Sequence, residues 1–117
     1  MNVTIYHNPK CSKSRKTLEL LSGRGLTPTI VEYLVTPPDA LTLKSILAKL
    51  KAEPREVMRA QEAPYLELGL ENDELTVDEL IEAMVNNPIL IERPIVVAGE
   101  RAVIGRPPEN VIDLIEN

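Results

Sequence analysis

The chain opens with an alternation of apolar and polar positions that gives way to a helical spacing. Over residues 2–6, Val3 and Ile5 share one face and polar side chains the other. This predicts a strand, because successive side chains of an extended chain point to opposite faces. A turn is expected at residues 8–9. From about Ser12 a stripe of leucines at positions 18, 20 and 21 predicts a helix that Gly23 and Gly25 end.

The rest of the chain continues this succession of strands and helices. A second strand is expected over residues 27–34, bounded by prolines before and after, and a helix over residues 39–51. Residues 54–70 predict two short helical pieces broken at Pro64. Thr76 and Glu79 form a T-x-x-E capping box that begins a helix over residues 76–87. The final segments are a hairpin of strands 95–97 and 102–104 turning near Gly99, and a helix over residues 107–117.

This order of elements predicts an α/β fold. The first strand, helix and strand should form a parallel pair. The closing hairpin adds antiparallel strands, so we expect a mixed four-stranded sheet flanked by helices, with a helical insertion before the hairpin. A β-α-β unit whose first strand leads to a cysteine at a helix N-terminus, followed by β-β-α, is the thioredoxin-like arrangement. We expect residues 1–117 to form one such domain.

Composition narrows the classes of protein to be considered. The chain has 117 residues, a net charge of −5 and one cysteine. Neither the charge nor any apolar run favours a nucleic-acid partner or a membrane span. A single cysteine forms no internal disulfide, so we expect a cytoplasmic protein. We also expect a monomer.

The lone cysteine lies in the stretch HNPKCSKSR, residues 7–15. Cys11 falls between the first strand and the first turn of the helix, where free backbone N–H groups and the helix dipole favour a thiolate. Lys10, Lys13 and Arg15 add positive potential, and such surroundings lower a cysteine pKa. The alternative is a small buried side chain, which the polar neighbours disfavour. Ser14 stands where a Cys-x-x-Cys motif has its second cysteine, so an outside thiol must complete any redox cycle.

Several blocks of the sequence resemble one family. The segment IYHNPKCSKSRKTLELL resembles the active-site segment of the ArsC family, the glutaredoxin-coupled arsenate reductases. The resemblance continues through EYLVTPP, EAPYLELGL, NNPILIERPIVV and GRPPENV, and so covers essentially the whole chain. The CSKS loop, with Ser12 and Lys13 after the cysteine, looks closest to one sub-branch of that family.

The resemblance implies a set of functional residues. It implies Cys11 as the nucleophile that attacks arsenate, and Arg59, Arg93 and Arg106 as the arginines that bind the oxyanion. His7 and Ser14 match supporting positions. Pro94 matches a proline that is cis in this family and faces the cysteine. The resemblance also implies glutathione as co-substrate and glutaredoxin as partner, with no bound cofactor.

The residue types agree with this chemistry, although each has a plainer interpretation. Arginine's planar fork makes bidentate hydrogen bonds to tetrahedral oxyanions, yet any one arginine can simply be a solvated surface residue. His7 can be a polar residue at a strand end, and Ser14 an ordinary serine of a helix first turn. One histidine and one cysteine do not make a zinc site, so no metal is expected.

We therefore interpret the sequence as a thiol-dependent reductase of arsenate or a similar oxyanion. Two alternatives stay open. One is a regulator resembling the Spx proteins, which bind RNA polymerase and typically carry Cys-x-x-Cys. The other is a thiol-redox enzyme acting on glutathionylated substrates, with the arginines holding glutathione carboxylates.

Overall fold

The computed structural model describes residues 1–116, which divide into two compact units. The first unit contains Met1–Thr36 and the chain from Arg93 onward, and the second contains Pro37–Glu92. The second unit is therefore an insertion in the sequence of the first. That all 117 residues act as one domain stays a prediction.

The first unit is built on a mixed four-stranded sheet of order β2-β1-β3-β4. Its parallel pair is β1 (Val3–His7) and β2 (Thr29–Glu32), connected through α1 (Ser12–Gly23). Its antiparallel strands are β3 (Ile95–Ala98), which pairs with β1, and β4 (Arg101–Ile104). Gly99 has φ +60° in the turn between the last two strands, a conformation that glycine adopts without strain. The predicted α/β fold class is confirmed.

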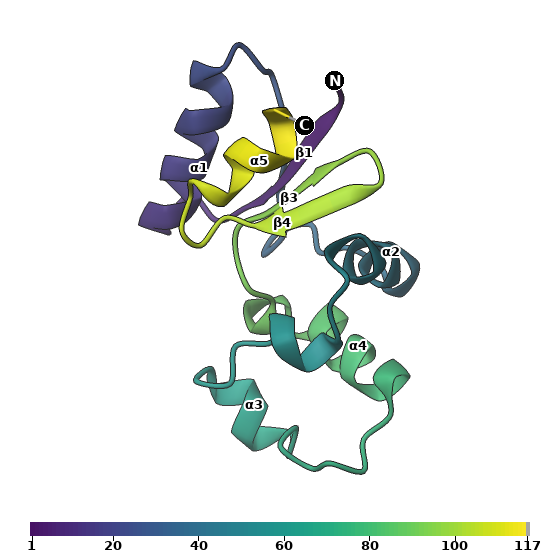
Figure 1. Ribbon diagram of the computed structural model, residues 1–117. Helices are drawn as coiled ribbons and strands as arrows, with labels where there is room; N and C mark the ends of the chain where they lie inside the picture. Colours follow the sequence, from purple (N-terminus) through teal and green to yellow (C-terminus); the bar gives the residue numbers. More distant parts are fainter. Residues whose placement is uncertain (117) are drawn as a thin grey trace. The chain divides into compact units, whose positions relative to one another are not determined.

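Two helices of this unit pack on one face of the sheet. They are α1 and α5 (Asn110–Glu116), which lie side by side in Figure 1. The buried core between them and the sheet consists of Val3, Ile5, Leu21, Val96, Val111 and Leu114. His7 follows Val3 and Ile5 at the strand's period of two, so its side chain also faces α1. The sheet thus fixes a polar residue beside the helix that carries the cysteine.

The second unit is helical. It contains α2 (Ala40–Leu50), η1 (Pro54–Val57), α3 (Ala63–Glu67), α4 (Val77–Asn86) and η2 (Pro88–Leu90). Asp39 caps α2 by accepting a hydrogen bond from the Thr42 N–H, and the predicted capping box of Thr76 and Glu79 begins α4. Buried residues of α2 and α4 face one another across the unit's core, among them Leu43, Ile46, Leu47, Leu80, Ile81 and Met84.

Some predicted boundaries were wrong. The second strand ends at Glu32 instead of residue 34, because the N–H groups of Val35 and Thr36 both donate to the Glu32 carbonyl and turn the chain. Pro64 does not break a helix: it lies in the first turn of α3, where its missing N–H costs no hydrogen bond. The last helix begins only at Asn110, and its predicted final residue, 117, lies outside the described residues.

Two backbone features complete the description. The Arg93–Pro94 peptide bond is cis, as predicted, and the Arg106–Pro107 bond is cis as well. Within residues 1–116, no helix is long and apolar enough to cross a bilayer.

Candidate active site

Cys11 is the N-cap residue of α1, with extended backbone dihedrals of φ −97° and ψ 123°. Its N–H donates to the Asn8 carbonyl at 3.0 Å, and its carbonyl accepts from the Arg15 N–H at 3.0 Å. The backbone N–H groups of Lys13 and Ser14 favour the thiolate form of its side chain. These N–H groups belong to the first turn of a helix, where no backbone carbonyl is available to them. The predicted position of the thiol at a helix N-terminus is confirmed.

The pKa of the Cys11 thiol is lowered from its ordinary value. Burial acts in the opposite direction and raises the pKa. The N–H groups of Ser14 and Lys13, together with the charge and a side-chain hydrogen bond of Arg93, outweigh that effect. The sequence argument assigns the cationic support to the neighbours of Cys11 in the chain. In the structure the contributing charge is that of Arg93, which comes from the other end of the chain.

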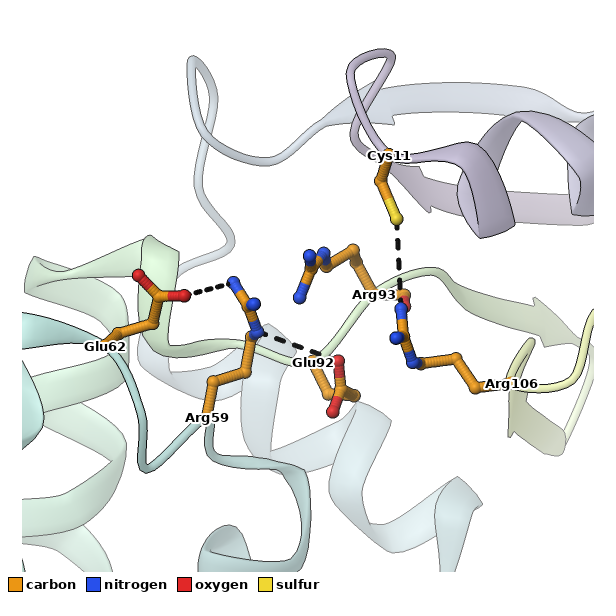
Figure 2. A network of polar contacts seen from close by, with 6 residues as sticks. All are labelled: Cys11, Arg59, Glu62, Glu92, Arg93 and Arg106. Carbon is orange, nitrogen blue, oxygen red and sulfur yellow. Dashed lines mark hydrogen bonds and ion pairs between the residues drawn. The ribbon is translucent and has the colours of Figure 1, made fainter.

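Arg106 also reaches the sulfur. Its Nη1 lies 3.8 Å from Cys11 Sγ and donates a second hydrogen bond to the Arg93 carbonyl at 3.3 Å (Figure 2). The segments that carry the two arginines are joined by a bond from the Gly105 N–H to the Pro94 carbonyl, at 2.9 Å. Two arginines distant in sequence are therefore brought to the thiol. Guanidinium groups beside a thiolate can bind a tetrahedral oxyanion next to the nucleophile.

His7 and Ser14 form a buried pair behind the cysteine. His7 Nδ1 and Ser14 Oγ are 2.6 Å apart, and the Asn8 N–H donates to the same hydroxyl oxygen at 3.0 Å. The side chains are 6% and 0% exposed. The pKa of His7 is lowered, mainly by burial, with a smaller opposite effect of Glu32 and a further lowering by Arg15. The ring of His7 therefore stays neutral at a lower pH than the ring of an exposed histidine does. The backbone N–H of its partner Ser14 is one of the two that lower the pKa of Cys11.

Arg59, the third predicted arginine, belongs to the second unit. Its side chain is 14% exposed and pairs with Glu62 at 2.7 Å and with Glu92 at 3.9 Å (Figure 2). Its N–H donates to the Leu90 carbonyl, which aligns the segment of Arg59 with that of Glu92. Sequence reasoning missed both carboxylates, although the three-residue spacing of Arg59 and Glu62 was a visible signal. The approach of Arg59 to Cys11 stays a prediction, since the two units are described separately.

Arg15 has a structural contact that sequence reasoning did not foresee. Its Nη1 donates to the Pro9 carbonyl at 2.9 Å and so braces the loop that leads into Cys11. Within the described chain, no three His, Cys, Asp or Glu side chains are grouped so that they could hold a metal ion.

Comparison with known proteins adds an independent line of evidence. The sequence model of the ArsC family matches residues 6–114. The chain is 54% identical to the uncharacterized protein YfgD of Escherichia coli strain K12, over 97% of this chain and 96% of that protein. It is 49% identical to an arsenate reductase of Neisseria meningitidis serogroup A, over 93% and 94% of the two chains.

A solved structure agrees with the fold as well as the sequence. The arsenate reductase from Vibrio cholerae superposes with a TM-score of 0.94 at 49% sequence identity, and the match covers 97% of each chain.

Proposed function

This chain belongs to the ArsC family, and we propose that it is a thiol-dependent reductase of arsenate or a similar tetrahedral oxyanion. The observation that carries the proposal is the Arg106 guanidinium 3.8 Å from a Cys11 sulfur whose pKa is lowered. The relatives named arsenate reductase support the same chemistry. A lowered thiol pKa supplies the nucleophile, and the arginine supplies hydrogen-bond donors for the anion it attacks.

The first step is attack of the Cys11 thiolate on arsenic(V). A sulfur–arsenic bond forms, an arsenic–oxygen bond breaks, and the oxygen leaves as water after taking up protons. Arg93 and Arg106 would hold the remaining oxygens, and the backbone N–H groups of Lys13 and Ser14 would stabilise the thiolate until it attacks. Arg59 would be a third anion ligand, exchanging its carboxylate partners for the substrate.

The remaining electrons come from outside thiols. The chain has one cysteine, so we propose glutathione as co-substrate and glutaredoxin as the partner that releases arsenite. Over one turnover, arsenate and two glutathione molecules give arsenite, glutathione disulfide and water, so that two thiols supply the two electrons that arsenic accepts. No bound cofactor takes part. The proposal includes a cytoplasmic monomer and membership of the CSKS sub-branch.

His7 and Ser14 would act as positioning residues. Their hydrogen bond at 2.6 Å fixes the side chain of Ser14, while the Ser14 N–H favours the thiolate form of Cys11. Pro94 holds the segment that presents Arg93. Ser14 also counts against the Spx-like alternative, because a serine cannot form the Cys-x-x-Cys disulfide on which such a redox switch depends.

The test is arsenite production from arsenate and glutathione, with and without glutaredoxin, by the wild type and by Cys11→Ser. We expect glutaredoxin-dependent turnover by the wild type and none by Cys11→Ser. Equal arsenite production by both proteins would contradict the nucleophile assignment. Turnover of a glutathionylated peptide without any arsenate reduction would favour the thiol-redox alternative.

A further inference from the structure

A groove of about 190 Å³ lies between the loop after β1 and the turn after β2. One wall is the segment Asn8–Lys10 and the other contains Glu32, Leu34 and Val35. Leu34 is 42% exposed and Val35 is 77% exposed, although both are aliphatic. The turn that presents them is fixed by hydrogen bonds from the Val35 and Thr36 N–H groups to the Glu32 carbonyl. Two neighbouring aliphatic side chains on a fixed turn offer an apolar contact to a ligand in the groove.

Two hydrogen bonds connect this groove with the segment that carries the reactive sulfur. The Asn8 carbonyl, from one wall, accepts the Cys11 N–H at 3.0 Å. His7 also lines the groove, and its ring is hydrogen-bonded to the hydroxyl of Ser14, which lies in the first turn of the helix that Cys11 caps. A molecule in the groove would therefore lie against the cysteine loop, on the side of residues 7–10.

The charges of the two walls are opposite. Lys10 contributes an exposed ammonium group on one side, Glu32 contributes an exposed carboxylate on the other, and the aliphatic side chains lie next to Glu32. A ligand that matches this pattern has a carboxylate at one end, an ammonium group at the other and a less polar centre. A short thiol peptide with free ends has this pattern.

We propose that this groove binds the thiol co-substrate, a cysteine-containing tripeptide of which glutathione is the example. The inference rests on the function proposed above. Lys10 would pair with a carboxylate of the peptide and Glu32 with its α-ammonium group, while Leu34 and Val35 contact the cysteinyl residue. The groove is smaller than the pockets of about 300–1,000 Å³ that enclose small molecules. It would hold the centre of the peptide and leave the ends on the charged rim, so we expect weak binding, with a Kd on the order of 1 mM.

A second groove next to the cysteine loop fits such a peptide less well. It is lined by Ser12, Lys13, Lys16, Pro108 and Glu109, with a volume of about 350 Å³. Its one apolar lining residue, Pro108, is buried. This surface offers cations but no exposed aliphatic contact. It therefore provides a matched control, because Lys16→Glu makes the same charge reversal as Lys10→Glu on the other groove.

The experiment is a titration of the ¹⁵N-labelled protein with S-methylglutathione, which binds as the tripeptide does but carries no free thiol. We expect shifts of the amide resonances of residues 8–10 and 32–35. Lys10→Glu and Glu32→Lys should each raise Kd by about 2–5-fold, as expected for the loss of one exposed ion pair, and Lys16→Glu should leave it unchanged. In the reductase assay the same two variants should raise KM for glutathione and leave KM for arsenate unchanged.

Three results would overturn the assignment. The first is a set of shifts confined to residues 12–16 and 108–109, and the second is equal weakening of binding by Lys16→Glu. The third is the absence of shifts at 10–20 mM S-methylglutathione, which is about ten to twenty times the expected Kd. Shifts of residues 8–10 and 32–35 with glutaredoxin alone would identify a protein-docking surface instead. The binding measurement does not depend on arsenate. A wild type that binds the tripeptide here but produces no arsenite would keep the groove assignment and reject the proposed reductase activity.

Discussion

Gly105 lies against α1 and Pro94, and we predict that Gly105→Ala destabilises the protein. An ideal Cβ at this position would lie 2.6 Å from Thr17 Oγ1 and 2.9 Å from Pro94 Cγ. Both distances are well below ordinary van der Waals contact, which is about 3.5–4.0 Å between carbons. Neither neighbour can move easily. Thr17 is fully buried, and its hydroxyl donates to the Lys13 carbonyl at 2.8 Å. The side chain of Pro94 is closed into a pyrrolidine ring, so it has no alternative rotamer that would move Cγ away.

The loss of folding free energy can be worked out from the interactions that Thr17 would lose. Turning its hydroxyl away would sacrifice a hydrogen bond, about 0.5–1.5 kcal/mol. It would also force the side chain from its rotamer, about 0.5–1.5 kcal/mol more. The total of about 1–3 kcal/mol equals the usual penalty of an overpacked core. Unfolding entropy is about 2.1 cal/mol/K per residue, so each kcal/mol lowers Tm by about 4 °C in a chain of 117 residues. We expect Tm to fall by about 4–12 °C.

The assay is thermal and urea denaturation, followed by circular dichroism, of the wild type, Gly105→Ala, Thr17→Ala and the double variant. Thr17→Ala removes both atoms of that side chain that a new Cβ would meet. The double variant should therefore be more stable than the two single effects predict by addition, by about 1–2 kcal/mol. Gly23→Ala is the matched control: it lies in α1 with nothing within 4 Å of a new Cβ, and should be neutral or stabilising by up to about 1 kcal/mol.

Gly105→Ala should also change the reactivity of the active-site cysteine. Arg106 directly follows Gly105, so a displaced backbone should move its guanidinium from the sulfur and slow alkylation of Cys11 in the folded protein. If Gly105→Ala were as stable as Gly23→Ala, or if the double variant were additive, the close contact would be refuted as a determinant of stability.

Three further predictions follow from individual residues. The rate of Cys11 alkylation by iodoacetamide should have its pH midpoint below that of free cysteine; because the folded pKa is lowered, this group's contribution to stability is present above the unfolded pKa and lost as pH falls through the folded pKa, and a midpoint at or above free cysteine would contradict it. Arg93→Lys should lower kcat/KM for arsenate about tenfold or more, since one charge-assisted hydrogen bond contributes about 1.5–3 kcal/mol; unchanged kinetics would remove Arg93 from the anion site. Thr76→Ala should lower the free energy of unfolding by about 1 kcal/mol in urea, whereas Thr76→Ser, which keeps the hydroxyl, should lose much less.

The sequence by itself determined the order of elements and the position of the thiol. Both depend on residues that are close in the chain. The alternation that ends at His7 and the helix that begins at Ser12 leave Cys11 as an N-cap, whatever the rest of the chain does. The capping box of α4 and the hairpin at Gly99 are local in the same way. The boundaries were less certain, because competing turn hydrogen bonds such as those to the Glu32 carbonyl decide them.

Only the tertiary structure decided which charges act on the thiol. From the sequence we predicted that the lysines next to Cys11 lower its pKa, but the charge that lowers it is that of Arg93. The sheet brings β3 beside β1, and the bond from Gly105 to Pro94 brings Arg106 next to Arg93. Such proximity arises from strand pairing and core packing between segments far apart in the chain. No pattern of neighbouring residues records it, because the interaction energies that create it exist only when the chain is folded.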